Sequence, residues 1–143
     1  MRKLALSDEI LLSIQQPARY IGGEVNMVVK DPSKVDVRFA MCFPDVYEIG
    51  MSHLGMQILY DFFNRRDDIY CERVYSPWTD LDKIMREKEI PLFSLESQSP
   101  IKEFDFLGIT LQYEMCYTNI LQILDLSQIP LHACDRTEAD PIV

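Results

Sequence analysis

Polar and aromatic side chains gather in three loops of the sequence, and each loop follows a short apolar run. The loops span residues 43–55, 75–79 and 112–119. They combine small residues, hydroxyl groups and aromatic rings, a mixture that suits a large, flat and partly polar ligand. We predict that the ligand contacts come from Tyr47, Ser52, His53, Thr110, Gln112 and Tyr113.

The sequence lacks the short motifs that mark several common reactions. It contains no G-x-G-x-x-G and no G-K-S or G-K-T, which argues against a dinucleotide or nucleoside-triphosphate site. It also lacks the strand–turn–helix elbow of a serine nucleophile. His53 and His132 are the only histidines, and neither stands at a known metal-ligand spacing from other ligands. We therefore assign no catalytic residue and no metal site to this chain.

The four cysteines, Cys42, Cys71, Cys116 and Cys134, are scattered along the sequence. They form no C-x-x-C pair and no C-x-x-x-C-x-x-C motif. In a chain of this size without a signal peptide, such cysteines indicate reduced thiols and a cytoplasmic protein. Cys116 lies near a predicted helix start, where a lowered thiol pKa is an alternative to a buried structural role.

Composition places the chain among compact, water-soluble domains. It has 143 residues, 48% of them apolar, and a formal net charge of -9. A domain of this length can bury a core without disulfides. The negative charge argues against a dedicated nucleic-acid binder, and no apolar run is long enough to cross a membrane.

Buried strands and amphipathic helices alternate along the chain. An alternation of this kind predicts an α/β fold, a Rossmann-like or flavodoxin-like parallel sheet with helices on both faces. Ser76 can cap the second main helix, and Pro77 suits its first position. The predicted strands are residues 25–29, 37–43, 69–75, 92–95 and 104–111, and the main predicted helices are residues 50–66, 76–88 and 115–127.

Two helices carry apolar patterns that we expect to face the core. Leu54, Ile58 and Phe62 recur at a spacing of four residues, with Leu59 and Phe63 alongside, and form one wide apolar face. In the third helix, the residues that we expect to point inward are Ile120, Leu121 and Leu124.

The chain divides into an N-terminal arm, residues 1–36, and an α/β domain, residues 37–143. In the arm, Ser7 predicts the start of a short helix with Asp8 and Glu9 in its first turn. Residues 141–143 are typical of the first step of a further strand, so we expect the domain to be incomplete at its C-terminal end.

Four segments of the chain resemble a known family. Residues 17–24 (PARYIGGE), 43–55 (FPDVYEIGMSHLG), 75–78 (YSPW) and 108–114 (GITLQYE) are similar to the N-terminal region of bacterial radical SAM proteins, Fe–S oxidoreductases with a cobalamin-binding-type N-terminal domain. The resemblance implies that such a domain precedes a barrel. In these proteins the barrel holds a 4Fe–4S cluster on C-x-x-x-C-x-x-C and cleaves S-adenosylmethionine to a radical.

Two motifs of the resembled proteins are absent from this sequence, and each absence limits which cofactor we expect this chain to bind and how. The cluster motif is absent, so we expect the 4Fe–4S cluster and S-adenosylmethionine only in a downstream radical SAM domain of the same polypeptide, which is the expected partner. The D-x-H-x-x-G signature is absent as well, and Asp45 and His53 do not have its spacing, so any cobalamin would bind without histidine ligation of cobalt.

The resemblance therefore implies a cofactor- or substrate-binding domain, of cobalamin type or a degenerate form of it, that is not catalytic alone. Two alternatives stay open. One is an interaction module that docks the barrel or a partner protein, in which Arg19 and Tyr20 support the association. The other is an independent flavin-binding domain.

Overall fold

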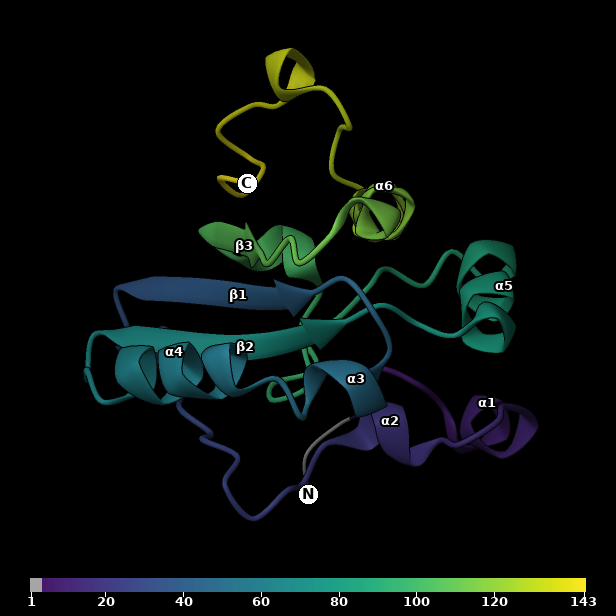
Figure 1. Ribbon diagram of the computed structural model, residues 1–143, viewed down its shortest axis with the longest axis horizontal. Coiled ribbons are helices and arrows are strands. Elements are labelled where there is room, and N and C mark those ends of the chain that lie inside the picture. Colours follow the sequence, from purple (N-terminus) through teal and green to yellow (C-terminus); the bar gives the residue numbers. More distant parts are fainter. Residues whose placement is uncertain (1–3) are drawn as a thin grey trace.

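The computed structural model describes residues 4–143, and a parallel sheet forms the centre of that part of the chain (Figure 1). Its strands are β1 (Val37–Phe43), β2 (Ile69–Tyr75) and β3 (Phe106–Ile109), in the order β2-β1-β3. In the register, Phe39 lies opposite Cys71 of β2 and opposite Phe106 of β3. β1 therefore occupies the middle of the sheet.

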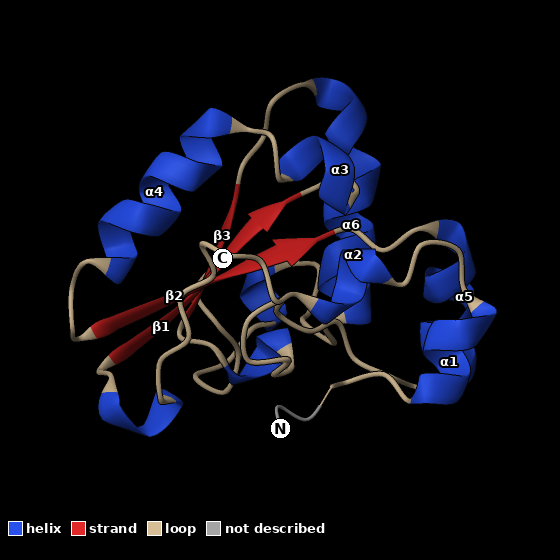
Figure 2. Ribbon diagram, turned by 90° about the horizontal axis from the view of Figure 1, so that it is seen from below, coloured by secondary structure: helices blue, strands red, loops and turns tan. Residues whose placement is uncertain are grey.

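Helices cover both faces of the sheet, which confirms the predicted α/β architecture (Figure 2). Helix α4 (Leu54–Asn64) packs on one face, and α5 (Thr79–Glu87) and α6 (Tyr117–Leu126) pack on the other. Alternate residues of β1 serve the two faces, since Met41 contributes to the α4 core and Cys42 to the α5 and α6 core. No helix within residues 4–143 is long and apolar enough to span a membrane.

Residues 141–143, predicted as the first step of a further strand, pair with β3 through a single bridge. Ile142 forms a parallel bridge with Phe106. The Leu107 N–H donates to the Ile142 carbonyl at 2.8 Å, and the Ile142 N–H donates to the Asp105 carbonyl at 2.9 Å. With this pairing, the strands follow the order of flavodoxin-like folds, in which the second strand lies beside the first on the side opposite the third.

The helix predicted over residues 50–66 begins only at Leu54, as α4, and a separate short helix, α3 (Tyr47–Gly50), precedes it. The break occurs because His53 adopts an extended backbone and caps α4, with its Nδ1 accepting the Met56 N–H at 3.3 Å.

The predicted inward face of α4 is wrong for most of its residues, although Phe63 packs against the core as predicted. Leu54, Ile58 and Phe62 are 71%, 58% and 62% exposed. Met56 and Tyr60 are buried against the sheet instead, because a second apolar stripe with the same spacing occupies the core. The exposed residues Leu54, Ile58 and Phe62 are called the α4 stripe below.

Several other sequence predictions need correction. Residues 25–29 form no strand, because the Val28 N–H donates to the Tyr60 hydroxyl at 2.8 Å instead of joining a ladder. Residues 92–95 contribute only an isolated antiparallel bridge between Phe93 and Pro100. β3 is shorter than predicted, since residues 104–105 and 110–111 lie outside the strand.

Helices α5 and α6 also differ in detail from their predictions. Ser76 does not cap α5, because its hydroxyl donates to the Gln122 Oε1 at 2.5 Å, and α5 begins after Trp78. In α6, Ile120 and Leu124 pack into the core as predicted, but Leu121 is exposed. Short 3-10 helices are formed by Pro32–Lys34, Ile101–Glu103, Glu114–Cys116 and Ala133–Asp135.

The N-terminal segment packs into the same core as α5 and α6. It contains α1 (Asp8–Ser13) and α2 (Ala18–Ile21). Ser7 caps α1 as predicted, with its hydroxyl accepting the Ile10 N–H at 3.4 Å. The buried side chains of this segment are Leu6, Ile10, Ile14 and Tyr20. The predicted domain boundary after residue 36 stays a prediction.

Gly108 of β3 gives a direct test of packing on the α4 face. A Cβ atom there would lie 2.5 Å from Cζ of Phe39, whose ring stacks on Phe63 and Phe106 at centroid distances of 5.0 and 6.0 Å. We expect Gly108→Ala to lower the free energy of unfolding by about 1–3 kcal/mol, because the ring has no room to move. Urea unfolding measures the change, with Ala at the exposed Asp67 as control. A free energy of unfolding equal to that of wild type would contradict the close packing of Gly108 against Phe39.

Candidate functional site

The carboxyl ends of β1 and β3 meet where the strand order reverses. The chain leaves β1 toward β2 on one side, whereas β3 lies on the other side, so the loops after β1 and β3 diverge. In Figure 1 the arrows of β1 and β3 point toward the side on which α3 and α6 lie. The two loops at these strand ends, residues 44–53 and residues 110–116, are together called the crevice below. Ligands of open α/β sheets bind at this place.

Tyr47 opens α3 in the first crevice loop. Its hydroxyl donates to a Glu24 carboxylate oxygen, and its ring meets the Tyr75 ring edge-on at 5.3 Å between centroids. Partial burial, together with the Glu24 carboxylate, raises the pKa of Tyr47 to about 12. Tyr47 is thus a fixed, protonated donor rather than a base.

Ser52 and His53 end the same loop. The Ser52 hydroxyl is exposed and donates to the Ile49 carbonyl at 2.9 Å. The His53 ring packs on Phe43 at 5.2 Å between centroids while its Nδ1 caps α4. His53 therefore has a structural role, and these two contacts fix the orientation of its ring.

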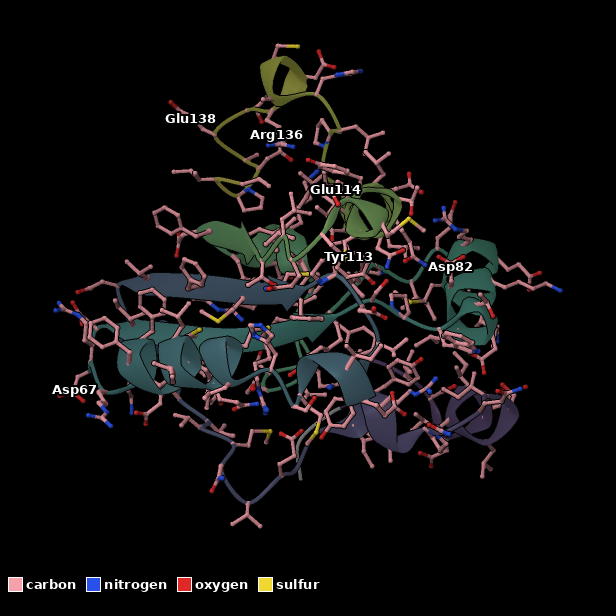
Figure 3. All side chains as sticks on the ribbon, in the orientation of Figure 1. Asp67, Asp82, Tyr113, Glu114, Arg136 and Glu138 are labelled. Carbon is pink, nitrogen blue, oxygen red and sulfur yellow. The ribbon has the colours of Figure 1, made fainter. Side chains whose placement is uncertain are left out.

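The second crevice loop begins at Thr110. Its N–H and its hydroxyl both donate to the Cys42 carbonyl, at 3.0 and 3.3 Å, and continue the ladder between β3 and β1. Gln112 and Tyr113 follow as exposed residues, with Tyr113 50% exposed. The pKa of Tyr113 is raised by the Cys116 side chain and by the Asp45 carboxylate of the opposite loop. Figure 3 shows Tyr113 and Glu114 where the chain enters α6.

The structure thus brings all six predicted contact residues to one edge of the sheet, three in each crevice loop. The exposed side chains are Ser52, Gln112 and Tyr113, whereas Tyr47, His53 and Thr110 are partly buried and bonded to other groups. Their contact with a ligand stays a prediction.

A small hollow adjoins the crevice at the ends of β1 and β2. Its volume is about 140 Å³. The Asn119 side chain spans its wall and donates to the Pro44 carbonyl at 2.8 Å. The polar lining comes from Asp45, Ser76, Thr79, Asn119 and Gln122. Sequence reasoning found the loops that line this hollow but missed Gln122, which lies within α6.

A buried ionic cluster, formed by Arg38, Glu72, Arg73, Glu96 and Glu24, lies behind the first crevice loop and was missed in the sequence. Glu72 is fully buried in β2. Its carboxylate accepts from Arg38 Nη2 at 2.9 Å and from the Ser94 hydroxyl at 2.6 Å. The only sequence signal is an adjacent acid–base pair, Glu72 and Arg73, inside an otherwise apolar strand.

Arg73 connects the two other carboxylates of the cluster. Its Nε donates to Glu96 at 2.6 Å, and its Nη2 pairs with Glu24, the partner of Tyr47. The guanidinium also lies over the Tyr60 ring, 4.7 Å from the centroid. Burial raises the pKa of Glu96 to about 7 against the opposing influence of Arg73. The cluster thus links the core to the crevice through Glu24.

A metal site has no basis in the part of the chain that the structure describes. Within residues 4–143, no group of three or more His, Cys, Asp or Glu side chains is placed to hold a metal ion.

Comparison with protein families identifies the chain. Residues 55–143, more than half of its length, match the family described as radical SAM proteins, N-terminal. The chain belongs to this family. The comparison with curated proteins and the comparison with solved structures returned no match.

The family match covers much of the site of this radical SAM N-terminal domain. It includes β2, β3, α5 and α6, and with them the second crevice loop. Of the buried ionic cluster, Glu72, Arg73 and Glu96 lie inside the matched region. Tyr47, Ser52 and His53 precede it. The resemblance to radical SAM proteins is thus confirmed at the level of the family.

Proposed function

We propose that the chain is a ligand-binding domain that holds a cofactor or substrate in the crevice for a radical SAM domain of the same polypeptide. The observation that supports the proposal is the position of the two crevice loops where the strand order reverses, with exposed aromatic and amide groups on the second loop. In this proposal the 4Fe–4S cluster and S-adenosylmethionine belong to the downstream domain, and this chain is not catalytic alone.

Cobalamin is the cofactor that we propose for the crevice. The exposed residues of the second loop, Leu111, Tyr113 and Met115, offer apolar surface for a flat ring system, and Ser52 and Gln112 can bond its polar side groups. Bound cobalamin would supply a cobalt centre for group or electron transfer. His53 does not suit cobalt ligation, because its ring is held by Phe43 and the α4 cap.

Titration of the full-length protein with hydroxocobalamin tests this proposal. We expect corrin to be retained on gel filtration, and we expect Tyr113→Ala to weaken binding about tenfold because an exposed aromatic contact is lost. Asp67→Ala, at the far end of the sheet in Figure 3, is the control. Wild-type protein that retains no corrin and shows no change in the visible spectrum would contradict the cofactor assignment.

The α4 stripe favours an interaction module as a second candidate. Three large apolar side chains on one exposed helix face form a surface suited to docking a radical SAM domain of the same polypeptide. Arg19 and Tyr20 fit such docking less well, because Arg19 pairs with Glu48 and Tyr20 is buried. This candidate predicts that the protein retains no corrin and that Tyr113→Ala behaves as wild type.

A further inference from the structure

A short N-terminal segment crosses beneath the first crevice loop and contacts it twice. This segment, residues 17–24, is called the strap below. At one end, Arg19 Nε donates to Glu48 Oε1 of α3 at 2.7 Å. At the other end, Glu24 accepts the Tyr47 hydroxyl. Two consecutive residues of α3 are thus held by opposite ends of the strap.

The local sequence explains why both ends of the strap reach α3. After the single turn of α2, Gly22 and Gly23 adopt positive φ angles of 60° and 92°. Residues with a Cβ atom rarely adopt such angles, so the glycines allow a sharp turn there. The turn redirects the chain, and Glu24 therefore reaches Tyr47 while Arg19 reaches Glu48.

The strap is itself fixed to the core by hydrogen bonds and an ion pair. It can therefore hold α3 in a fixed position. The Tyr20 hydroxyl accepts the Trp78 N–H at 3.1 Å, and the Tyr20 carbonyl accepts Gln98 Nε2 at 3.0 Å. Glu24 pairs with Arg73, which is held by the fully buried Glu96. Rigid support from a second layer of bonded groups is what keeps a binding residue in place.

Electrostatics strengthens both contacts. Burial acts to raise the pKa of Glu48, but the hydrogen bond from Arg19, a backbone hydrogen bond and the Arg19 charge together lower it, while the bond to Glu48 raises the pKa of Arg19. Both side chains are therefore charged at neutral pH. The Tyr47–Glu24 bond is charge-assisted as well, since a hydroxyl donates to a carboxylate.

We propose that the strap is a positioning element for the crevice, in which Glu24 fixes Tyr47 and Arg19 fixes Glu48. This inference rests on the proposed function of the crevice as a ligand site. Glu24 and Arg19 are positioning residues, because in the structure they act through Tyr47 and Glu48. The presence of a strap also explains why α3 can be stable although it has only one turn.

Amide hydrogen exchange on the full-length protein tests the strap directly. We expect Glu24→Ala to speed exchange at the amides of residues 47–51 about tenfold, because a charge-assisted bond to Tyr47 is lost. Exchange in β1 and α6 should stay at the wild-type rate. Glu87→Ala, which breaks the exposed Lys83–Glu87 pair on α5, is the matched control and should change none of these amides.

A double substitution separates positioning from a general loss of stability. If Glu24 acts through the Tyr47 hydroxyl, Tyr47→Phe produces the same local increase in exchange, and Glu24→Gln combined with Tyr47→Phe adds little to it. Glu24→Gln also serves as the milder variant if Glu24→Ala fails to fold. Fully additive effects, or wild-type exchange at residues 47–51 in both Glu24 variants, would overturn the inference.

Hydroxocobalamin titration of the same variants distinguishes the inference from the proposed function. We expect Glu24→Gln to weaken binding about tenfold. If wild-type protein binds no corrin while the Glu24 variants still loosen residues 47–51, the cofactor proposal fails and the positioning role of the strap stands. If wild-type protein binds corrin and the variants bind equally well, the strap does not position the ligand site.

Discussion

Arg73→Met is expected to lower the free energy of unfolding by about 3–5 kcal/mol, the largest loss from any single side chain considered in this protein. The substitution keeps an apolar stem of similar length but removes the charge that faces Glu96 and Glu24. Glu96 is fully buried, so its carboxylate loses its cationic partner where water cannot replace it. Urea unfolding followed by circular dichroism at pH 7.5 measures the effect.

Arg65→Met is the matched control for this substitution. Arg65 pairs with Asp61 at 2.7 Å, but its side chain is largely exposed, so the loss should be about 0–1 kcal/mol. The double variant Arg73→Met and Glu96→Met should recover much of the lost stability, because the fully buried charge is then removed and the remaining carboxylate, Glu24, is partly exposed to water. Equal losses from Arg73→Met and Arg65→Met would contradict the importance of the buried pair.

Glu96 should make the stability of the protein depend on pH in an unusual direction. Burial raises its pKa from 4.5 to about 7 in the folded protein. The folded state therefore binds this proton more tightly than the unfolded state, and its contribution is complete below pH 4.5 and is lost as the pH rises through 7. Relative to Glu96→Gln, wild-type protein should lose about 3 kcal/mol between pH 4.5 and pH 7.5.

Urea unfolding of both proteins at pH 4.5, 6.0 and 7.5 measures this dependence. The difference between wild type and Glu96→Gln isolates the carboxyl, because all other titrating groups are shared. Glu87→Gln, at an exposed position on α5, should show a difference that stays nearly constant with pH. A wild-type advantage that grows with rising pH would show that the Arg73 charge, rather than burial, controls Glu96.

The sheet could be predicted from the sequence because its strands carry a local signal. Residues 37–43 and 69–75 are short runs rich in apolar residues between turns, and the structure has β1 and β2 at the same bounds. The cap at Ser7 is equally local, since it depends on residues within one helical turn.

The orientation of α4 could not be predicted in this way. The helix has two apolar stripes with the same spacing, the α4 stripe and the one that contains Met56 and Tyr60. Periodicity indicates a helix but does not choose between two apolar faces, because the choice depends on contacts with the sheet. A similar limit applies to residues 25–29, whose apolar side chains indicated a strand although no ladder partner was available.

The candidate site was predictable in outline and not in its supporting groups. Loops after parallel strands meet at one edge of a sheet, so Tyr47 and Tyr113 could be placed together from topology alone. The buried ionic cluster depends on partners that are distant in sequence, since Arg73 bonds Glu96 and Glu24, 23 and 49 residues away. No local sequence pattern predicts such contacts.

The packing of the N-terminal helix into the core has a consequence for the order in which the protein folds. Ala5 is hydrogen-bonded to Gln98, 93 residues later in the chain, and Ile10 shares a cluster with Ile123 of α6. During synthesis, the apolar side chains of α1 leave the ribosome before α6, which supplies part of the surface that buries them. We therefore expect them to stay exposed until α6 has been synthesised, and we expect the closing of this long loop to be a slow step in the folding of the domain.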